Sequence, residues 1–434
     1  MKFPGRRRHK HYFPVDSKDP LTNKLSDLPR NQSNYIVGID QVVVDIEALV
    51  EDEFFQKYQL KKGMSQLVSD ELAEDLYTSL QSANLIRFEF AGGTIGNTLH
   101  NYSVLADDRS VLFGVMSEDI KIGGYAYRYV SNTSSHVDLN YLQGVNGPIG
   151  RCFTLIDSNG ERTFAISPGH MDKLKPSSIN SSIIEQSSAL VISAYLMRAR
   201  DGDTMTDATL EAVRIANSAN VPVILTLGTK FLIEEDPEWW KNFIKNHVTI
   251  LAMNEEEAEA LTECSSPLKA ADLALSLADL VICTAGPKGM FIAGYVDEEH
   301  KRATEYALLP GDIPDFNAYE YSRPMLFSEC KQPLKVYSHV APYMGGPDSI
   351  KNTNGAGDGA LAAILHDLAA NDYHKNNVKS SSKHNQRALT YSSLSQMCKY
   401  ANRVSYEVLA QHSPRLTKGL PEREDSLEQA YWSK

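Results

Sequence analysis

The chain has 434 residues, of which 42% are hydrophobic and 23% are charged, as in a globular protein with one large domain or two of ordinary size. Its formal net charge of −12 argues against a nucleic-acid-binding protein, because such domains are usually basic. No apolar stretch reaches the roughly 18 residues that a membrane-spanning helix needs. We therefore expect neither nucleic acid nor a membrane among the partners.

The first 34 residues are expected to lie outside the folded domain. They begin with the basic stretch MKFPGRRRHKHYFP, which lacks the apolar core of a signal peptide. We expect a poorly ordered, solvated tail, although a basic tail can also contact an acidic partner. The five cysteines show neither a CxxC pair nor metal-site spacing, so a reducing, cytoplasmic setting fits best.

The first third of the chain mixes antiparallel-type alternation with helices. Residues 35–50, YIVGIDQVVVDIEALV, are rich in β-branched residues and predict a strand. Residues 69–85 begin with a Ser-Asp cap and continue with helical spacing. Residues 151–167 form two alternating runs around a Ser-Asn-Gly turn, which indicates a β-hairpin. These features predict a small sheet packed over the mouth of a larger one.

The rest of the chain alternates between apolar strands and amphipathic helices. Short, nearly all-apolar runs occur at 189–196, 221–228, 248–254 and 280–286. Helical segments such as DATLEAVRIANSAN and EEEAEALT lie between them. This order predicts an α/β fold with a doubly wound, mostly parallel sheet whose strands are buried on both faces. Two long polar segments, about 297–335 and 371–387, are expected to be excursions from the large domain.

In an open parallel sheet, ligands bind beyond the carboxyl ends of the strands, so the residues that follow each apolar run are the first candidates for a site. These positions are rich in small residues, carboxylates and amide donors. They contain no His/Cys cluster and no Ser-His-Asp arrangement in plausible register, which disfavours metal-hydride and acyl-transfer chemistry. The candidates include Asp40, Asp45, Tyr195, Arg198, Asn254, Glu257 and Thr284.

The stretch NTNGAGDGALAAIL, residues 352–365, places small residues around Asp358 and continues as an apolar run. A helix that starts here presents unpaired amides and the positive end of its dipole, which suits a phosphate. Gly355, Ala356 and Gly357 would let that phosphate approach the backbone, and Asp358 could accept a proton from an attacking hydroxyl. The alternative is a glycine turn with Asp358 as a helix cap. The motif is not a Walker loop, because no Lys-Ser/Thr pair follows the glycines.

Four separated stretches, in this order, resemble motifs of the ribokinase family of carbohydrate and purine kinases. They are AGGTIGNT (91–98), NEEEAEAL (254–261), TAGPKGM (284–290) and NGAGDGA (354–360). The resemblance extends from about residue 35 to about residue 415. It implies a ribokinase-like domain over 35–434, with a small β-sheet lid from strands within about 35–170. The nucleotide-binding core is then expected mainly in 171–434.

Within the family, five further stretches resemble a branch that acts on purine nucleosides: HNYSVLADDRSVLFGVM, YLQGVNGPIGRCFTLI, FAISPGHM, VILTLGTKF and YSHVAPYMGGP. The resemblance implies ATP- and Mg²⁺-dependent phosphorylation of inosine and guanosine at the 5′-hydroxyl, giving IMP and GMP in purine salvage. The partners that the resemblance implies are a small-molecule nucleoside and ATP, and it leaves open whether the protein forms a homodimer. A K⁺ site also stays open, because Asn352 stands where the family has an aspartate.

The resemblance also implies roles for individual residues. Asp358 would be the general base, and the amides of Gly355, Ala356 and Gly357 would bind the γ-phosphate. The residues implied for the sugar site are Asp40, Asp45, Gly92, Gly93, Thr94 and Asn97. Those implied for ATP are Asn254, Glu257, Thr284, Gly286, Gly289, Gly357 and Asn402, with Glu257 acting on the metal through water. Asn254 and Glu257 also have a simpler interpretation as a helix cap.

Base recognition rests on Arg198. Guanine and hypoxanthine both offer O6 and N7 as acceptors, which an arginine fork matches. Arg198 follows a predicted strand at its carboxyl end and could supply that fork, or it is a surface arginine. Two other functions are weighed, an adenosine or sugar kinase of the same fold and a non-catalytic nucleoside-binding protein. A nicotinamide-dependent dehydrogenase would need a GxGxxG turn after the first strand, which GIDQVVVD lacks.

Overall fold

The computed structural model describes residues 34–106, 108–199, 202–304, 318–343, 346–417 and 419–420. The predicted N-terminal tail lies outside the described residues, apart from Asn34. Within the described ranges, no helix combines the length and the apolarity that a membrane crossing requires.

The larger of two sheets has ten strands in the order β15-β14-β13-β12-β11-β10-β1-β5-β6, with β7 beside β5. Its pairs are parallel except those that β14 makes with β13 and β15. The strands are β1 Tyr35–Ile39, β5 Arg109–Ser117, β6 Val137–Asp138, β7 Leu142–Val145, β10 Ala189–Ser193, β11 Val223–Thr226, β12 Ile250–Asn254, β13 Leu280–Thr284, β14 Met290–Asp297 and β15 Pro333–Val340. The predicted doubly wound, mostly parallel sheet is confirmed.

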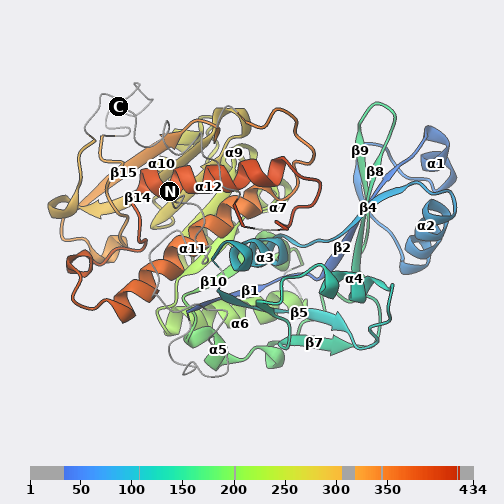
Figure 1. Cartoon of the computed structure of the whole chain (residues 1–434), viewed down its shortest axis with the longest axis horizontal. Helices are drawn as coiled ribbons and strands as arrows, with labels where there is room; N and C mark the ends of the chain where they lie inside the picture. Colours follow the sequence, from blue (N-terminus) through green and yellow to red (C-terminus); the bar gives the residue numbers. More distant parts are fainter. Residues whose placement is uncertain are drawn as a thin grey trace, which may run out of the picture.

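Helices cover both faces of this sheet (Figure 1). One core cluster joins Ile36, Val191 and Ile224 to α3, α11 and α12, and a second joins Val37, Leu190 and Val223 to α6, α8, α9 and α10. Neighbouring residues of one strand thus enter opposite cores, as alternation in a strand requires. The helices of this domain are α3 Thr94–Ala106, α5 Ser181–Glu185, α6 Thr204–Ser218, α7 Lys230–Glu235, α8 Pro237–His247, α9 Glu255–Thr262, α10 Pro267–Ala274, α11 Ala356–Asn377 and α12 Leu394–Leu409.

The smaller sheet projects from one end of the larger domain (Figure 1). Its order is β3-β9-β8-β2-β4, and helices α2 and α4 pack on it. Along β2 the burial alternates, so that Val44, Ile46 and Ala48 are buried while Asp45 stays half-buried on the opposite face. The elements are β2 Val43–Leu49, β3 Ser65–Leu67, β4 Ile86–Ala91, β8 Gly150–Ile156, β9 Arg162–Ser167, α1 Asp52–Lys57, α2 Asp70–Ser82 and α4 Tyr125–Ser131.

The single strand predicted over 35–50 is wrong, because the structure has two strands there. β1 is buried on both faces in the large sheet, whereas β2 alternates and joins the small one. The three residues between them, 40–42, carry the chain from one sheet to the other. The sequence shows one continuous apolar bias, and this change of partner sheet is decided by tertiary pairing.

The other local predictions have mixed outcomes. The helix near 69–85 and the hairpin over 151–167 are confirmed as α2 and as β8–β9. The polar segment 371–387 is partly helical, because α11 continues to Asn377 before a 3-10 turn at Ser382–Asn385. Of the segment 297–335, residues 305–317 lie outside the described part, and the remainder includes short 3-10 turns and the start of β15.

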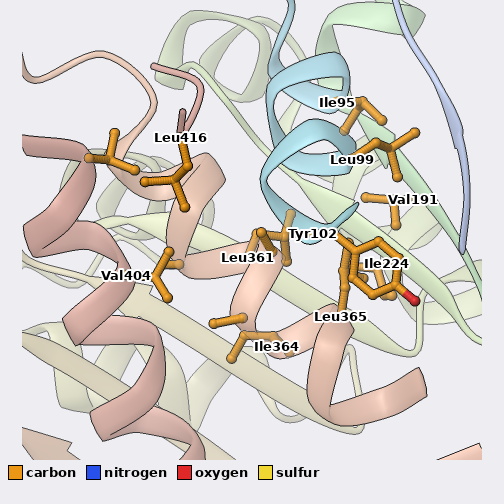
Figure 2. Packing of buried hydrophobic residues seen from close by; sticks show 14 of the residues in the cluster. Ile95, Leu99, Tyr102, Val191, Ile224, Leu361, Ile364, Leu365, Val404 and Leu416 are labelled. Atoms are coloured by element: carbon orange, nitrogen blue, oxygen red, sulfur yellow. The ribbon is translucent and has the colours of Figure 1, made fainter. Parts of the chain in front are cut away.

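Helix α11 is the central buried element of the domain. Residues 359–369 are all buried, so this part of the helix has no solvent-facing side. Leu361, Ile364 and Leu365 of α11 lie between α3, α12 and the sheet (Figure 2). The turns of α11 that follow its first turn are therefore held by a packed core on several sides.

We predict that Leu365→Ala lowers the free energy of unfolding by about 2–5 kcal/mol, because it leaves a cavity in a fully buried position. Urea denaturation monitored by circular dichroism measures this loss. Leu273→Ala on α10 is the matched control, since that leucine is 50% exposed and its removal should change stability little. Equal effects of the two substitutions would contradict the central place given to α11.

Candidate active site

The glycine signature forms a tight turn into α11. Gly355 caps the helix with φ 83°, in the left-handed region, and a Cβ there would lie 2.5 Å from Pro414 Cβ. Gly357 is exposed, and a Cβ there would meet nothing within 4 Å. The turn that precedes Gly355 is closed by Asn352, whose Oδ1 accepts from the Asn354 amide at 3.0 Å. The first turn thus presents backbone amides beside open space, as a phosphate site requires.

Asp358 lies in that first turn and remains half-buried. Its Oδ2 accepts a hydrogen bond from Asn97 Nδ2 at 3.1 Å. Among the described residues Oδ1 has no donor, which leaves one carboxylate oxygen for a ligand. Burial raises the pKa of Asp358 to about 7, and the nearby Asp45 adds to the rise while Asn97 and Arg415 oppose it. A carboxylate with this pKa is suited to accept a proton near neutral pH.

The predicted Gly-Gly-x-x-x-Asn motif forms the turn into α3. Gly93 has φ 86°, and a Cβ there would lie 2.2 Å from Asp40 Oδ2. Asp40 is 3% exposed and accepts from the Gly96 amide at 2.6 Å, so its carboxylate satisfies the start of α3. Thr94 is the first residue of the helix, and Asn97 follows one turn later. Burial raises the pKa of Asp40 to about 7.

Asp45 faces the same space from the small sheet. A Cβ at Gly92 would lie within 2.7 Å of both Asp45 carboxylate oxygens, so glycine is required for this close approach. Burial raises the pKa of Asp45 to about 7, while the charge of Arg415 lowers it. The structure therefore brings Asp45, Gly92 and Asp358 close together, although they are far apart in the sequence.

Asn254 and Glu257 form a complete capping box at the start of α9. Asn254 Oδ1 accepts from the Glu257 amide at 2.9 Å, and the Glu257 carboxylate accepts from the Asn254 backbone amide at 3.0 Å and from its side chain at 2.8 Å. The helix-cap interpretation is confirmed. Glu257 is nevertheless buried at the carboxyl end of β12, and burial raises its pKa to about 7. Its charge also raises the pKa of Asp358, so the two carboxylates interact.

The remaining predicted ATP residues lie at the neighbouring strand ends. Thr284 ends β13 and pairs with Asn254 of β12. Gly286 and Gly289 form the turn into β14, and a Cβ at Gly289 would lie 2.1 Å from the carbonyl oxygen of Val340. Asn402 of α12 donates to the carbonyl of Ala341, which ties this helix to the chain just after β15.

Arg198 is exposed beyond the carboxyl end of β10. Its guanidinium carbon lies 5.5 Å from the ring centroid of Tyr195, whose hydroxyl donates to the Gly228 carbonyl at 2.7 Å. The pKa of Tyr195 is raised to about 12 by burial, with smaller contributions from Glu257 and Asp358. Tyr195 thus contacts Arg198 and also interacts with the charges of Glu257 and Asp358.

Sequence reasoning missed Arg415, which donates from Nε to Asn97 Oδ1 at 2.9 Å. It also missed the contact of the small sheet with the chain after α12, where the rings of Phe88 and His412 stack at 4.4 Å. Arg415 is one arginine in the stretch HSPRLTK beyond the last helix. No local pattern distinguishes it from a surface residue.

The large domain has a doubly wound sheet, a small β-sheet projects from it, and an aspartate follows a glycine turn at a helix start. This arrangement is typical of the class of kinases that phosphorylate sugars and nucleosides. The model of the pfkB family carbohydrate kinases matches residues 124–308. The guanosine-inosine kinases of Escherichia coli K12 and O157:H7 are each 62% identical over 434 residues, 100% of both chains. The chain therefore belongs to the pfkB family of carbohydrate kinases, and it is a phosphotransferase with a hydroxyl acceptor.

Solved structures show the same fold. Adenosine kinase from Sinorhizobium meliloti aligns with a TM-score of 0.63 at 21% identity, over 92% of this chain and 99% of that one. Adenosine kinase from Schistosoma mansoni in complex with 2-fluoroadenosine aligns with a TM-score of 0.60 at 17% identity, over 90% and 99%. The predicted resemblance to the ribokinase family and its fold is confirmed.

We predict that Gly355→Ala lowers both stability and turnover, because alanine at φ 83° is strained and its methyl group would meet Pro414. Gly357→Ala is the matched control for stability. Its methyl group meets no atom within 4 Å, so the melting temperature should not fall, while the approach of a phosphate is hindered. Thermal denaturation and steady-state kinetics of both variants test this. A Gly355→Ala protein as stable as the parent would contradict the strained turn.

Proposed function

We propose that this protein transfers the γ-phosphoryl group of ATP to the 5′-hydroxyl of inosine and guanosine, giving IMP and GMP in purine salvage. The relatives named guanosine-inosine kinase, 62% identical over the whole chain, support this substrate class. One observation carries the chemistry: Asp358, with a raised pKa and one unpaired oxygen, lies at the amide-lined start of α11 and faces Asp45 of the small sheet.

In this proposal, Asp358 Oδ1 accepts the proton of the 5′-hydroxyl as its oxygen attacks the γ-phosphorus. The amides of Gly355, Ala356 and Gly357 donate to the phosphoryl oxygens, where negative charge builds in the transition state. Phosphoryl transfer needs little beyond such positioning and charge stabilisation. The helix dipole of α11 also stabilises this negative charge, because its positive end points at the transferred phosphoryl group.

The sugar would lie between the small sheet and the start of α3. Asp45 is the proposed ligand of the ribose hydroxyls, since a half-buried carboxylate in an apolar strand gains most from hydrogen-bond donors. Gly92 and Gly93 allow the ribose to approach the backbone. Asp40 is a weaker candidate, because its carboxylate is almost fully buried against Gly96. Asn97 is proposed at the edge of the sugar site, where its amide already bonds to Asp358.

ATP is proposed to lie across the ends of β12, β13 and β14, near Thr284, Gly286, Gly289 and Asn402. Mg²⁺ bound to its phosphates would neutralise part of their charge. No group of three or more His, Cys, Asp or Glu residues in the described ranges could chelate a metal directly. Glu257 fits an indirect role, because Mg²⁺ in nucleotide sites keeps several waters and the carboxylate, which accepts from Asn254 and Gly228, has a further lone pair for a water. Asn352 accepts from the Asn354 amide within its own turn and donates to the His412 carbonyl at 2.8 Å, and a dependence on K⁺ is not part of the proposal.

A reducing compartment such as the cytoplasm is proposed because all five cysteines are free thiols. The homodimer stays a prediction.

We predict that the protein phosphorylates inosine and guanosine in preference to adenosine and fructose 6-phosphate when the four compete for labelled ATP. Arg198→Ala should raise KM for both nucleosides and leave KM for ATP nearly unchanged, because it removes the proposed donor fork for O6 and N7 from its place beside Tyr195. Preferential labelling of adenosine or of the sugar phosphate would replace the proposed acceptor. No transfer in a single turnover would indicate a nucleoside-binding protein, and an unchanged nucleoside KM would remove Arg198 from the site.

We predict that Asp358→Asn lowers kcat at least ~10²-fold, the usual contribution of a positioned base. In the parent, kcat should fall as the pH drops below about 7, because protonated Asp358 cannot accept the proton. The variant should lose this acid limb.

The fold of Asp358→Asn serves as the control. The folded-state pKa of Asp358 is raised, so its contribution to stability is present at low pH and is lost as the pH rises through about 7. Removing its charge should therefore not lower the melting temperature at pH 8. Near-normal turnover in a folded variant would end the assignment of Asp358 as the base.

A further inference from the structure

Arg415 lies in a short segment, residues 411–417, that follows α12 and returns to α3 and the Gly-Gly turn. The segment is fixed to α3 on both sides of Arg415. Asn101 Nδ2 donates to the Pro414 carbonyl at 3.1 Å, and the Leu416 amide donates to Asn101 Oδ1 at 2.8 Å. Leu416 is buried and lies among the core residues of this region (Figure 2). The backbone of Arg415 is therefore held by two buried hydrogen bonds and an apolar anchor.

Arg415 is 3% exposed, and its guanidinium donates in several directions at once. Nε donates to Asn97 Oδ1 at 2.9 Å, Nη2 to the Gly92 carbonyl at 3.0 Å, and Nη1 to Thr133 Oγ1 at 2.6 Å. Its carbon lies 4.9 Å from the ring centroid of Tyr129. It thus connects the glycine turn, α3 and the end of α4. A lysine ammonium lacks the planar fork that makes these three bonds together.

The bond from Arg415 decides which way the Asn97 amide faces. A guanidinium can only donate, so the amide oxygen must face it and the amide nitrogen must face Asp358. In that orientation Nδ2 donates to Asp358 Oδ2 at 3.1 Å. In the reverse orientation, Oδ1 would face the carboxylate and two acceptors would oppose each other.

Arg415 also acts on Asp358 through its charge. Its positive charge lowers the pKa of Asp358, whereas Asp45 of β2 and Glu257 of α9 raise it. The same charge lowers the pKa of Asp40. All three hydrogen-bond acceptors named above are neutral, so none of them offsets the guanidinium charge. That charge lowers the pKa values of Asp40, Asp45 and Asp358.

We propose that Arg415 is a positioning residue of the phosphoryl-transfer site, which orients the Asn97 amide so that Asp358 keeps one oxygen fixed and offers the other to the acceptor hydroxyl. The proposal rests on the proposed function. It extends the site to a segment beyond the last helix, which no motif of the sequence includes.

Two substitutions separate the charge of Arg415 from its hydrogen bonds. Arg415→Met removes both, so kcat should fall at least tenfold and the acid limb of its pH profile should move up by roughly one pH unit, the low end of the effect of a nearby opposite charge. Arg415→Lys keeps the charge but cannot bond to Asn97, Gly92 and Thr133 together, so Asn97 is held less firmly and kcat should fall while the acid limb stays near its parental position. KM for ATP should change little in both.

The matched control is Arg323→Met. Arg323 is 5% exposed and donates to the Thr390 carbonyl and to Asn371. Asn371 lies about 20 Å from Asp358 along α11. Its loss should reduce stability without moving the acid limb. The proposal is overturned if Arg415→Met and Arg323→Met lower stability alike and neither moves the limb. If Arg415→Met does not fold, a parental kcat in Arg415→Lys overturns it.

The unaltered protein is assayed in parallel with inosine and guanosine. Absence of transfer by that protein would refute the proposed function itself. If the unaltered protein is active and the Arg415 variants match it in kcat and in the acid limb, only the proposed role of Arg415 is refuted.

Discussion

The hydrogen bond between Asn97 and Asp358 joins the two helices on which the proposed active site is built. α3 follows the Gly-Gly turn of the proposed sugar site, and α11 begins at the amide-lined turn of the proposed phosphate site. Both helices pack against each other and against the sheet, so their starts are held at a fixed separation. A reaction that depends on the position of one carboxylate requires this rigidity, because small displacements of reacting groups are costly.

The site places several acids where water is scarce. Asp40, Asp45, Asp358 and Glu257 each have a pKa raised to about 7, with burial as the largest cause. Each of these groups therefore disfavours folding as the pH rises, and the packed core around α11 must offset that cost. Backbone amides and Arg415 reduce the cost without neutralising any acid through a direct ion pair. In the proposed function, Asp358, Asp45 and Glu257 serve the acceptor hydroxyl, the ribose and the hydrated metal.

Glycines lie at several close contacts between the two sheets and their helices. Gly92 accommodates the Asp45 carboxylate, and Gly96 leaves room for Arg415 and the Tyr129 hydroxyl. Gly355 accommodates Pro414, whose neighbour is Arg415. Three contacts that shape the site thus depend on the absence of a Cβ. In each case the glycine partner is an element distant in the sequence.

The sequence by itself determined the alternation of strands and helices, the capping box of Asn254 and Glu257, and the glycine turn before Asp358. These features follow from local periodicity and from side chains that bond to their own backbone. Only the tertiary structure decided that residues 35–50 divide between two sheets, that Asp40 is used to cap α3, and that Arg415 reaches Asn97. Each of these depends on partners that are distant along the chain, and a single sequence gives no signal for such a contact.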